Sequence, residues 1–372
     1  MGRLDLNVSM PSLDHQRQQD NLAFIASGSE FSFGAASDCP LPLDHLSQLH
    51  ANSPGVEALM SSGLTAEVLR LRVGTRCFAI KKARQRCLVQ NLDGQTSFLN
   101  ELQRHAELRA LRETGVDLPG VVAPVYGSLR HGMVVAPWID GQHPTDGSLR
   151  PLTQLLSTGC QLLEHGFFEW DFCAGNLLDD GAQLWLFDFG YMYRFDPLTQ
   201  FNSAGDGTNC PRHHLAERIE GRYLFGNLLR VEQHDGLAAA VEQFVAFKRL
   251  ALQAYIGLHT RLVARGASEL VLAHYQALIT SWTHALSAHP RLLYLRDGWC
   301  AHSSDLDDDL HGQSCTARTL QRADWLLDSI QHHHGALLET EALSPSDRQH
   351  KQHSLHHHYH AKRERARAYL MA

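Results

Sequence analysis

The segment from His165 to Gly190, HGFFEWDFCAGNLLDDGAQLWLFDFG, is the feature that most constrains what this chain can fold into. Two short apolar runs within it, NLL and LWLF, lie on either side of the turn-forming triplet Asp179-Asp180-Gly181. Apolar runs separated by turn residues predict two short strands joined by a tight turn. Three polar residues, Asp171, Asn176 and Asp188, flank these runs. Carboxylates and an amide can bind protons and hard cations, so we expect the segment to carry chemistry as well as structure.

The spacing of these residues resembles the catalytic loop and metal-binding loop of the protein-kinase-like superfamily. In that pattern an Asp is followed by four residues and an Asn, and a hairpin then leads to Asp-Phe-Gly. Here Asp171 is followed by Asn176, and the second predicted strand leads to Asp188-Phe189-Gly190. The resemblance implies that Asp171 orients or deprotonates an acceptor hydroxyl, and that Asn176 and Asp188 hold Mg²⁺ beside ATP. The string DFCAGNLL is similar in style to aminoglycoside-phosphotransferase-like and lipopolysaccharide-kinase-like bacterial proteins.

Upstream of this segment, the pattern predicts strands around one helix. Residues 68–73 alternate apolar and basic side chains, and Cys77–Ile80 is a second apolar run after the turn Gly74-Thr75. This arrangement predicts a β-hairpin. Residues 97–113 carry apolar side chains at helical spacing, and the runs VVAPVYGSL and GMVVAPWI then predict two more strands.

The resemblance extends to Phe78-Ala79-Ile80-Lys81, which is similar to the V-A-I-K strand of kinases. It implies that Lys81 holds the α- and β-phosphates and that Ala79 lines the nucleotide site. Glu101 in the following predicted helix would pair with Lys81, with Glu107 as the second choice. Lys82 would point to the other face of the sheet, because side chains alternate along a strand.

The glycine-rich loop expected before this strand is sparse. Only Ser61-Ser62-Gly63, followed by Val68, stands where the family places G-x-G-x-x-G-x-V. Ser62, Gly63 and Val68 are therefore the residues expected to contact nucleotide, with backbone amides cradling phosphate. No A-P-E triplet follows the metal-binding loop, and Glu217 is a candidate for its buried glutamate.

The catalytic loop departs from the family pattern at two further places. Glu169-Trp170 replaces the usual His-Arg before Asp171, which removes the arginine that commonly receives a phosphorylated activation loop. Cys173 stands where protein kinases usually place a lysine that contacts the transferred phosphate. The charge of that lysine must come from elsewhere or be dispensed with. Both departures favour an atypical kinase that is not switched by loop phosphorylation.

The chain has 372 residues, of which 44% are hydrophobic, and this is enough to bury a substantial core. The expected class is α+β: a bilobal protein-kinase-like fold with a small antiparallel-sheet N-lobe over residues 51–145 and a mostly helical C-lobe over 146–345. Residues 1–50 are rich in Ser, Asp, Asn, Gln, Gly and Pro without periodicity, which predicts a flexible or loosely docked leader. Residues 346–372 are expected to form a His-rich and basic tail.

The composition limits the partners and the compartment. A net charge of -7 gives no electrostatic reason to expect nucleic acid as a partner. No apolar stretch reaches the length of a membrane span, and the N-terminus has no apolar run like that of a signal peptide. The eight cysteines include no C-x-x-C pair, which indicates reduced thiols in a cytoplasmic protein.

Four other clusters have alternative interpretations. The histidines between 332 and 360 could bind a transition metal, or form a histidine-biased surface or disordered tail. Asp305–Asp309 could bind a cation or a basic partner, or form a solvated acidic loop. Lys362–Arg367 could touch nucleic acid or anionic lipid, or form a charged helical end, which is the more typical case. Arg212, His213 and His214 could approach an anionic acceptor.

The sequence therefore predicts an ATP- and Mg²⁺-dependent phosphotransferase that transfers the γ-phosphate to a hydroxyl group. The acceptor, a protein or a small molecule, stays open because acceptor choice depends on the helical lobe and its loops. Transfer of AMP in place of phosphate also stays open. The alternatives are a pseudokinase that acts as a nucleotide-binding regulatory or interaction module, and a metal-binding protein centred on the histidine-rich tail.

Overall fold

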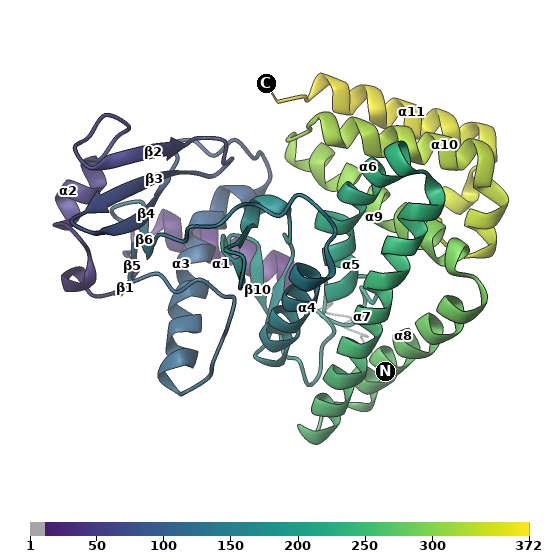
Figure 1. The fold of residues 1–372 in the computed structure, drawn as a ribbon, viewed down its shortest axis with the longest axis horizontal. Coiled ribbons are helices and arrows are strands. Elements are labelled where there is room, and N and C mark those ends of the chain that lie inside the picture. Colours follow the sequence, from purple (N-terminus) through teal and green to yellow (C-terminus); the bar gives the residue numbers. More distant parts are fainter. Residues whose placement is uncertain (1–11, 372) are drawn as a thin grey trace, which may run out of the picture.

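The structure is a computed structural model that describes residues 12–371. It combines a six-stranded antiparallel sheet, two small two-stranded sheets and a large set of helices. Figure 1 shows a strand-rich part at the left, formed by the N-terminal portion of the chain, and a helical part at the right. The expected mixture of an antiparallel sheet with helices is thus present. In the described residues, no helix combines the length and apolar character needed to cross a bilayer.

The large sheet has the strand order β1-β5-β6-β4-β3-β2. The predicted hairpin is confirmed, since β3 and β4 pair antiparallel from Val73↔Arg76 to Ala66↔Ala83 across the turn at Gly74. Gly74 has a φ of 60°, a conformation that glycine adopts without strain. The strands are β1 (Ser32–Gly34), β2 (Val56–Met60), β3 (Ala66–Val73), β4 (Arg76–Ala83), β5 (Tyr126–Ser128) and β6 (Met133–Pro137).

The expectation of a flexible or loosely docked leader over residues 1–50 is wrong for residues 12–50, and residues 1–11 lie outside the described chain. This region forms α1 (Leu13–Ala26), β1, a 3₁₀ turn at Ala36–Asp38 and α2 (Leu43–Gln48). Leu46 and Leu49 are fully or almost fully buried against the large sheet. Each of these elements is too short to show a clear period of apolar residues in the sequence. The polar composition of the region therefore led to the wrong prediction of a flexible leader.

Helix α3 (Leu92–Glu113) lies against the other face of the sheet. It begins five positions before the predicted residue 97, because the Asn91 side chain caps it by accepting a hydrogen bond of 2.7 Å from Gly94 N. Its Leu102 is buried with Phe33 of β1 and Val134 of β6. The helix is therefore fixed to the sheet on its apolar side.

The helical part is built on one large apolar cluster that includes α4, α7 and α8. The predicted helices within 152–163, 213–287 and 317–342 are confirmed in outline, whereas α9 was not predicted. The elements are α4 (Leu149–Glu164), β7 (Phe167–Glu169), η2 (Ala174–Asn176), β8 (Leu177–Asp179), β9 (Leu184–Leu186), β10 (Met192–Arg194), α5 (Leu215–Ile219), η3 (Glu220–Leu224), α6 (Phe225–Asp235), α7 (Leu237–Ala264), α8 (Glu269–Ala288), α9 (Pro290–Gly312), α10 (Ala317–Glu339), η4 (Asp347–Gln349) and α11 (Gln352–Ala368).

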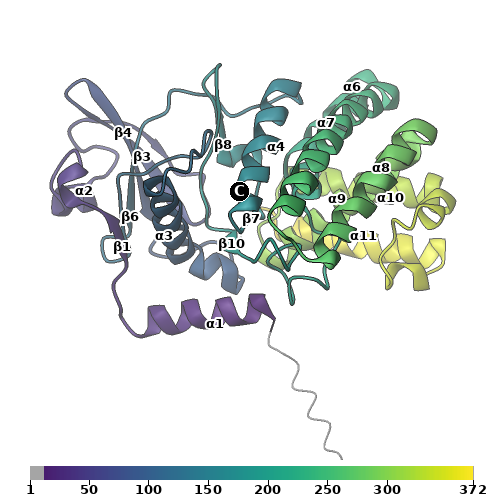
Figure 2. The same cartoon turned by 90° about the horizontal axis from the view of Figure 1, so that it is seen from below.

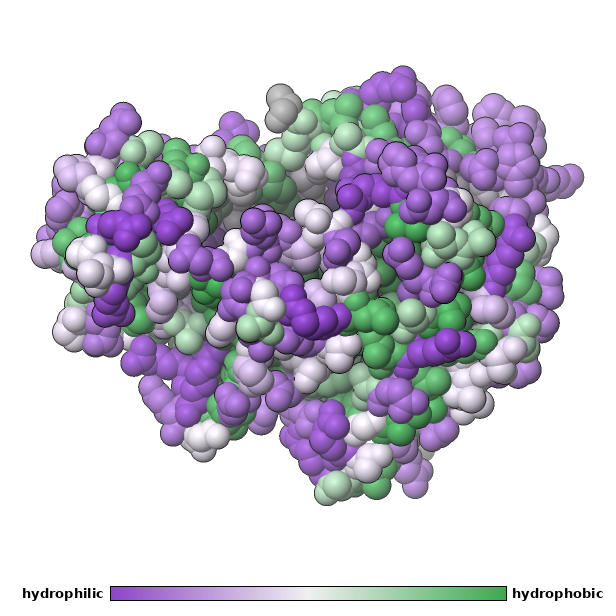
Figure 3. Space-filling model, viewed as in Figure 1, coloured by the Kyte–Doolittle hydropathy of each residue, from purple (hydrophilic) through white to green (hydrophobic). Residues whose placement is uncertain are grey.

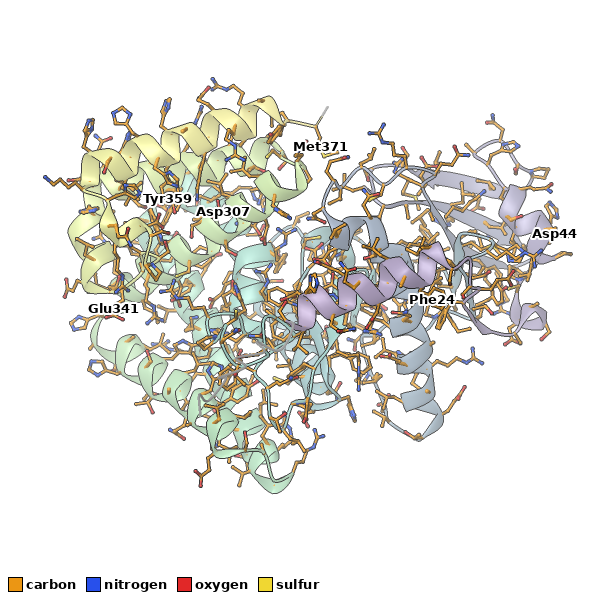
Figure 4. All side chains as sticks on the ribbon, turned by 180° about the vertical axis from the view of Figure 1, so that it is seen from behind. Phe24, Asp44, Asp307, Glu341, Tyr359 and Met371 are labelled. Atoms are coloured by element: carbon orange, nitrogen blue, oxygen red, sulfur yellow. The ribbon has the colours of Figure 1, made fainter. Side chains whose placement is uncertain are left out.

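The C-terminal region is a packed helix, and the alternative of a disordered histidine-rich tail is wrong. Leu355, Tyr359 and Ala366 of α11 are buried in a second apolar cluster with α9 and α10. The Tyr359 hydroxyl donates a hydrogen bond of 3.1 Å to Asp347 Oδ2. Figure 4 shows Tyr359 on the inner side of α11, toward the helix that carries Asp307. The histidines lie mostly on the exposed side of the same helix.

Helix α1 crosses from the strand-rich part to the helical part, as Figures 2 and 4 show. Arg17 forms an ion pair of 3.0 Å with Asp93 at the start of α3, and its guanidinium lies 3.5 Å from the centre of the Tyr193 ring. One turn earlier on α1, Asp14 Oδ2 accepts a hydrogen bond of 2.8 Å from Gly205 N. The helix thus connects α3, β10 and the 200–207 loop.

We expect Arg17→Ala to lower the free energy of unfolding by about 1–2 kcal/mol, because it removes a half-buried ion pair together with a cation–π contact. Arg130→Ala is the matched control, since Arg130 and its partner Glu30 are both exposed, and it should cost less than about 0.5 kcal/mol. Urea denaturation of the two variants measures both values. Equal effects would show that α1 is not anchored through Arg17.

Candidate functional site

A buried lysine between two carboxylates lies at the centre of the candidate site. Lys81 Nζ is 2.7 Å from Glu101 Oε2 and 2.9 Å from Asp188 Oδ2. The Glu101 side chain is 3% exposed, whereas that of Asp188 is 29% exposed. The predicted choice of Glu101 is therefore confirmed, and Glu107 instead pairs with Arg104. Strand β4, helix α3 and the segment after β9 meet at this point.

Strand alternation explains why Lys81 and not Lys82 reaches this position. Ile80 is buried in the cluster beneath α2, so its neighbour Lys81 must point to the opposite face. Lys82 again points toward α2, where its Nζ donates hydrogen bonds of 2.7 Å to Ser47 O and 2.8 Å to Leu49 O. A cation at the end of a helix satisfies carbonyl groups that have no partner within the helix. Lys82 thus has a structural partner, as the alternation predicted.

The residues expected to contact nucleotide lie on two neighbouring strands and the loop before them. Val68 of β3 is opposite Lys81, and Ala79 of β4 lies two residues before it, so both share its face of the sheet. Ser62 and Gly63 are exposed in the β2–β3 connection. Arg84 holds this loop, donating a hydrogen bond of 2.8 Å to Gly63 O. The loop that replaces the glycine-rich pattern is therefore tied to the end of β4.

Asp188 is placed by the predicted hairpin. Strands β8 and β9 pair antiparallel from Leu177↔Leu186 to Asp179↔Leu184, and Asp188 follows with a φ of 64°. Aspartate tolerates this left-handed conformation better than most residues. The Asn100 side chain of α3 donates to the carbonyl oxygens of Phe189 and Gly190, both at 3.1 Å, and of Met192 at 2.8 Å. These bonds hold α3 against the loop that presents Asp188.

Asp171 and Asn176 are joined directly. Asn176 Nδ2 donates to Asp171 O at 3.0 Å and to Asp171 Oδ2 at 3.2 Å. Because the amide nitrogen is used in this way, the Asn176 carbonyl oxygen is left as a ligand for a cation. One amide oxygen and the carboxylate of Asp188 fit Mg²⁺, which commonly takes one or two protein ligands and completes its shell with phosphate and water.

Glu169 holds the backbone of the loop that carries Asp171. Its Oε1 accepts a hydrogen bond of 2.7 Å from Asp171 N, its side chain is buried, and its Oε2 has no partner among the described residues. Burial raises the pKa of this carboxyl well above its ordinary value, with the nearby Asp171 and Asp188 adding to the effect. The surroundings of Glu169 therefore favour its neutral acid form.

The pKa shifts of Lys81, Glu101 and Asp188 indicate a different role for each of these three residues. Burial alone would lower the pKa of Lys81, but the carboxylates of Asp188 and Glu101 raise it to about 12. Burial would raise the pKa of Glu101, but Lys81 and His105 lower it to about 2. For Asp188, burial outweighs Lys81 and raises the pKa. The Lys81–Glu101 pair is thus ionised at neutral pH, whereas Asp188 is a partly exposed carboxylate that a bound cation would stabilise in its charged form.

Arg222 was not predicted from the sequence, and it joins Asp171 to Asp305, a residue of the acidic run that could have bound a basic partner. Arg222 Nε lies 2.8 Å from Asp171 Oδ1, and Arg222 NH1 lies 2.6 Å from Asp305 Oδ1. The interpretation of Asp305–Asp309 as a solvated acidic loop is wrong, because these residues form the end of α9 and Asp305 is buried. Asp305 also pairs with Arg322 of α10 at 2.7 Å. An acidic run followed by an arginine-containing helix was the only signal.

The remaining candidates lie farther from this chemistry. His214 is buried and its Nδ1 is 3.0 Å from the Tyr255 hydroxyl, and burial lowers its pKa to about 3. It is therefore a core residue and does not approach an acceptor. Glu217 is 3.6 Å from Arg218 NH1 and 3.5 Å from His213 Nδ1. Helix α5 thus has its own ion pairs.

The metal-binding alternative finds no support. Within residues 12–371, His, Cys, Asp and Glu side chains nowhere gather in threes at a distance suited to binding a metal ion. A cavity of about 570 Å³ lies between α4 and α7 beside Cys160 and shares no residue with the Lys81 cluster. Figure 3 shows the surface hollowed between the strand-rich part at the left and the α9–α11 helices at the upper right.

Comparison with known proteins gives no relative for this chain: no family model matches it, and no curated protein matches it. The candidate site therefore rests on its own geometry.

Glu169→Gln is expected to remove a pH dependence of stability. Since the pKa of Glu169 is raised above its ordinary 4.5, the folded protein keeps a proton that the unfolded chain releases as the pH rises above that value. Stability is then lost by up to about 1.4 kcal/mol per pH unit until the folded pKa is passed. Glutamine keeps the bond from Asp171 N without this loss.

Urea denaturation of wild type and Glu169→Gln between pH 4.5 and 8 tests this, with the exposed Glu113→Gln as control. The stability difference should grow in favour of the Glu169→Gln variant as the pH rises, while the control difference stays flat. Parallel curves for wild type and Glu169→Gln would contradict a protonated Glu169.

Proposed function

We propose that this chain is an ATP- and Mg²⁺-dependent phosphotransferase with a bilobal protein-kinase-like fold. The observation that carries the proposal is the contact of Lys81 with both Glu101 and Asp188, beside the hydrogen-bonded pair of Asp171 and Asn176. These residues come from β4, α3 and the two loops around the β8–β9 hairpin. A fold has no structural need to gather all five polar groups where three strands and a helix meet.

The arrangement answers the electrostatic problem of phosphoryl transfer. The phosphate oxygens of a nucleotide need a fixed positive charge, and Lys81 is held in place by an anion that remains ionised at every physiological pH. Asp188 and the Asn176 carbonyl oxygen would hold Mg²⁺, which when bound neutralises charge on the β- and γ-phosphates. Asp171 would accept the proton of the acceptor hydroxyl. Val68 and Ala79 would contact the nucleotide on the same face as Lys81.

Glu101 makes the position of Lys81 independent of phosphorylation. The ion pair is formed in the chain as it stands, and α3 is fixed by its own contacts to the loop after Asp188. Trp170 occupies the place where an arginine would receive a phosphorylated loop, and its Nε1 donates 2.8 Å to Ser203 Oγ. The proposed enzyme is therefore active without that switch.

Lys81→Ala should reduce ATP turnover by about 100-fold or more, because it removes the preorganised charge for the phosphates. Lys82→Ala is the matched control, since Lys82 only donates hydrogen bonds to carbonyl groups at the end of α2. This variant should keep turnover while losing about 0.5–1 kcal/mol of stability. The assay is mass spectrometry of nucleotides, chain and extract components after incubation with Mg-ATP, alone and with cell extract.

Equal turnover by the Lys81→Ala and Lys82→Ala variants would contradict the proposed site. The wild-type chain could instead bind nucleotide without turning it over. If Asp188→Asn then loses nucleotide binding only when Mg²⁺ is present, the result would support a nucleotide-binding regulatory module. A mass gain corresponding to AMP on the acceptor would keep the site but change the transferred group.

A further inference from the structure

The catalytic loop lacks a cation beside Asp171. Cys173 stands two residues after it, where a lysine would carry the charge. Burial raises the pKa of the Cys173 thiol well above its ordinary value, Asp171 raises it further, and the nearby Arg222 lowers it only in part. The thiol is therefore neutral and cannot balance charge on a phosphoryl group in transfer.

Arg222 brings a guanidinium to the same place from the helical part of the chain. Its Nε donates 2.8 Å to Asp171 Oδ1, and its NH1 donates to Asp305. The side chain of Arg222 is 21% exposed and that of Asp171 is 19% exposed, so both reach solvent at the site. A guanidinium has five N–H donors, and these two bonds leave the others for a further anion.

The backbone around Arg222 is built to hold this position. Residues Glu220–Leu224 form a π-helical turn, a rare conformation that often marks functional sites. Arg322 NH2 donates 2.9 Å to Gly221 O. Glu220, two residues before Arg222, is buried in an ion pair with Lys248 of α7. The turn is therefore anchored to α7 on one side and presents Arg222 to Asp171 on the other.

Asp305 does not cancel the charge of Arg222. Its carboxylate is shared between Arg222 at 2.6 Å and Arg322 at 2.7 Å, so two guanidiniums face one buried carboxylate. The pair keeps a positive charge that is balanced by Asp171, with Asp309 also nearby. When Asp171 takes up the proton of an acceptor, that balance is lost and a neighbouring anion gains attraction to Arg222.

We propose that Arg222 supplies the positive charge for the transferred phosphoryl group that the catalytic loop lacks at Cys173. The inference rests on the proposed function. In the step, the acceptor oxygen forms a bond to the γ-phosphorus, the bridging P–O bond breaks with its electron pair passing to ADP, and the acceptor proton passes to Asp171. Arg222 keeps its protons throughout and hydrogen-bonds to the oxygens of the transferred group.

The first test needs no acceptor. Titration calorimetry with Mg²⁺ compares ADP with the β,γ-imido analogue of ATP, which differs by the terminal phosphoryl group. In Arg222→Ala and Arg222→Gln, affinity for the analogue should fall by about 10-fold or more while ADP affinity is unchanged, because one charged hydrogen-bond donor is lost. Arg318→Ala, on the neighbouring helix without contact to Asp171, should bind both as wild type does.

The second test relocates the charge. Turnover should fall in Arg222→Ala, with the KM for ATP raised in line with the weaker binding of the analogue, and Cys173→Lys in the same chain should recover at least part of the turnover. A purely structural Arg222 would not be replaced by a lysine at position 173. The melting temperature of each variant shows whether it is folded. If Arg222→Ala is not folded, Arg222→Gln, which keeps hydrogen-bond donors at this position, replaces it in the test.

The outcomes separate this inference from the proposed function. If wild type binds both nucleotides and turns over ATP, and Arg222→Gln lowers neither the affinity for the analogue nor turnover, the role of Arg222 is refuted and the proposed function stands. If Arg222→Gln turns over faster than wild type, Arg222 restrains Asp171 and the inference is refuted. If wild type binds neither nucleotide, both proposals fail.

Discussion

The ammonium group of Lys81, held between Glu101 and Asp188, is the interaction on which the arrangement of the molecule depends. Removing the lysine would leave the buried Glu101 carboxylate without its opposite charge, which costs about 3–5 kcal/mol. The sheet, α3 and the loop after β9 must therefore stay together, because each contributes one of the three charges. Because side chains alternate along β4, the adjacent Lys82 points to the opposite face of the sheet, where it hydrogen-bonds to α2 and holds that helix against the sheet.

The position of α3 follows from this constraint and is reinforced at its N-terminal end. There Asp93 pairs with Arg17 of α1, and Gln90 N donates 3.3 Å to Gly312 O at the end of α9. Elements from both termini of the chain thus hold the helix that carries Glu101. These contacts, and the bonds of Asn100 to the loop after Asp188, position that helix in the chain as it stands.

The sequence predicted those parts of the site that depend on local order. The hairpin bringing Asn176 and Asp188 together is contained in a short segment, and strand alternation at Lys81 needs only its neighbours. The role of Arg222 escaped prediction because its partners are distant in the chain: Asp171 lies 51 residues before it and Asp305 lies 83 residues after it. The polar composition also led to wrong predictions at both ends of the described chain. At the C-terminal end, the polar residues on the exposed side of α11 hid the pattern of the buried Leu355 and Tyr359.

The C-terminal helices are part of the site and not an appendage to it. Asp305 lies on α9, whose Trp299 packs against Tyr359 of α11 with ring centres 5.1 Å apart. The end of the chain also returns to α9, since Met371 N donates 2.9 Å to Cys315 O just beyond it. Loss of α11 would expose the apolar surface that orders α9, and with it the carboxylate that orients Arg222. The expected boundary at residue 345 therefore cuts through one packed unit, and the chemistry of Asp171 depends on residues on the far side of it.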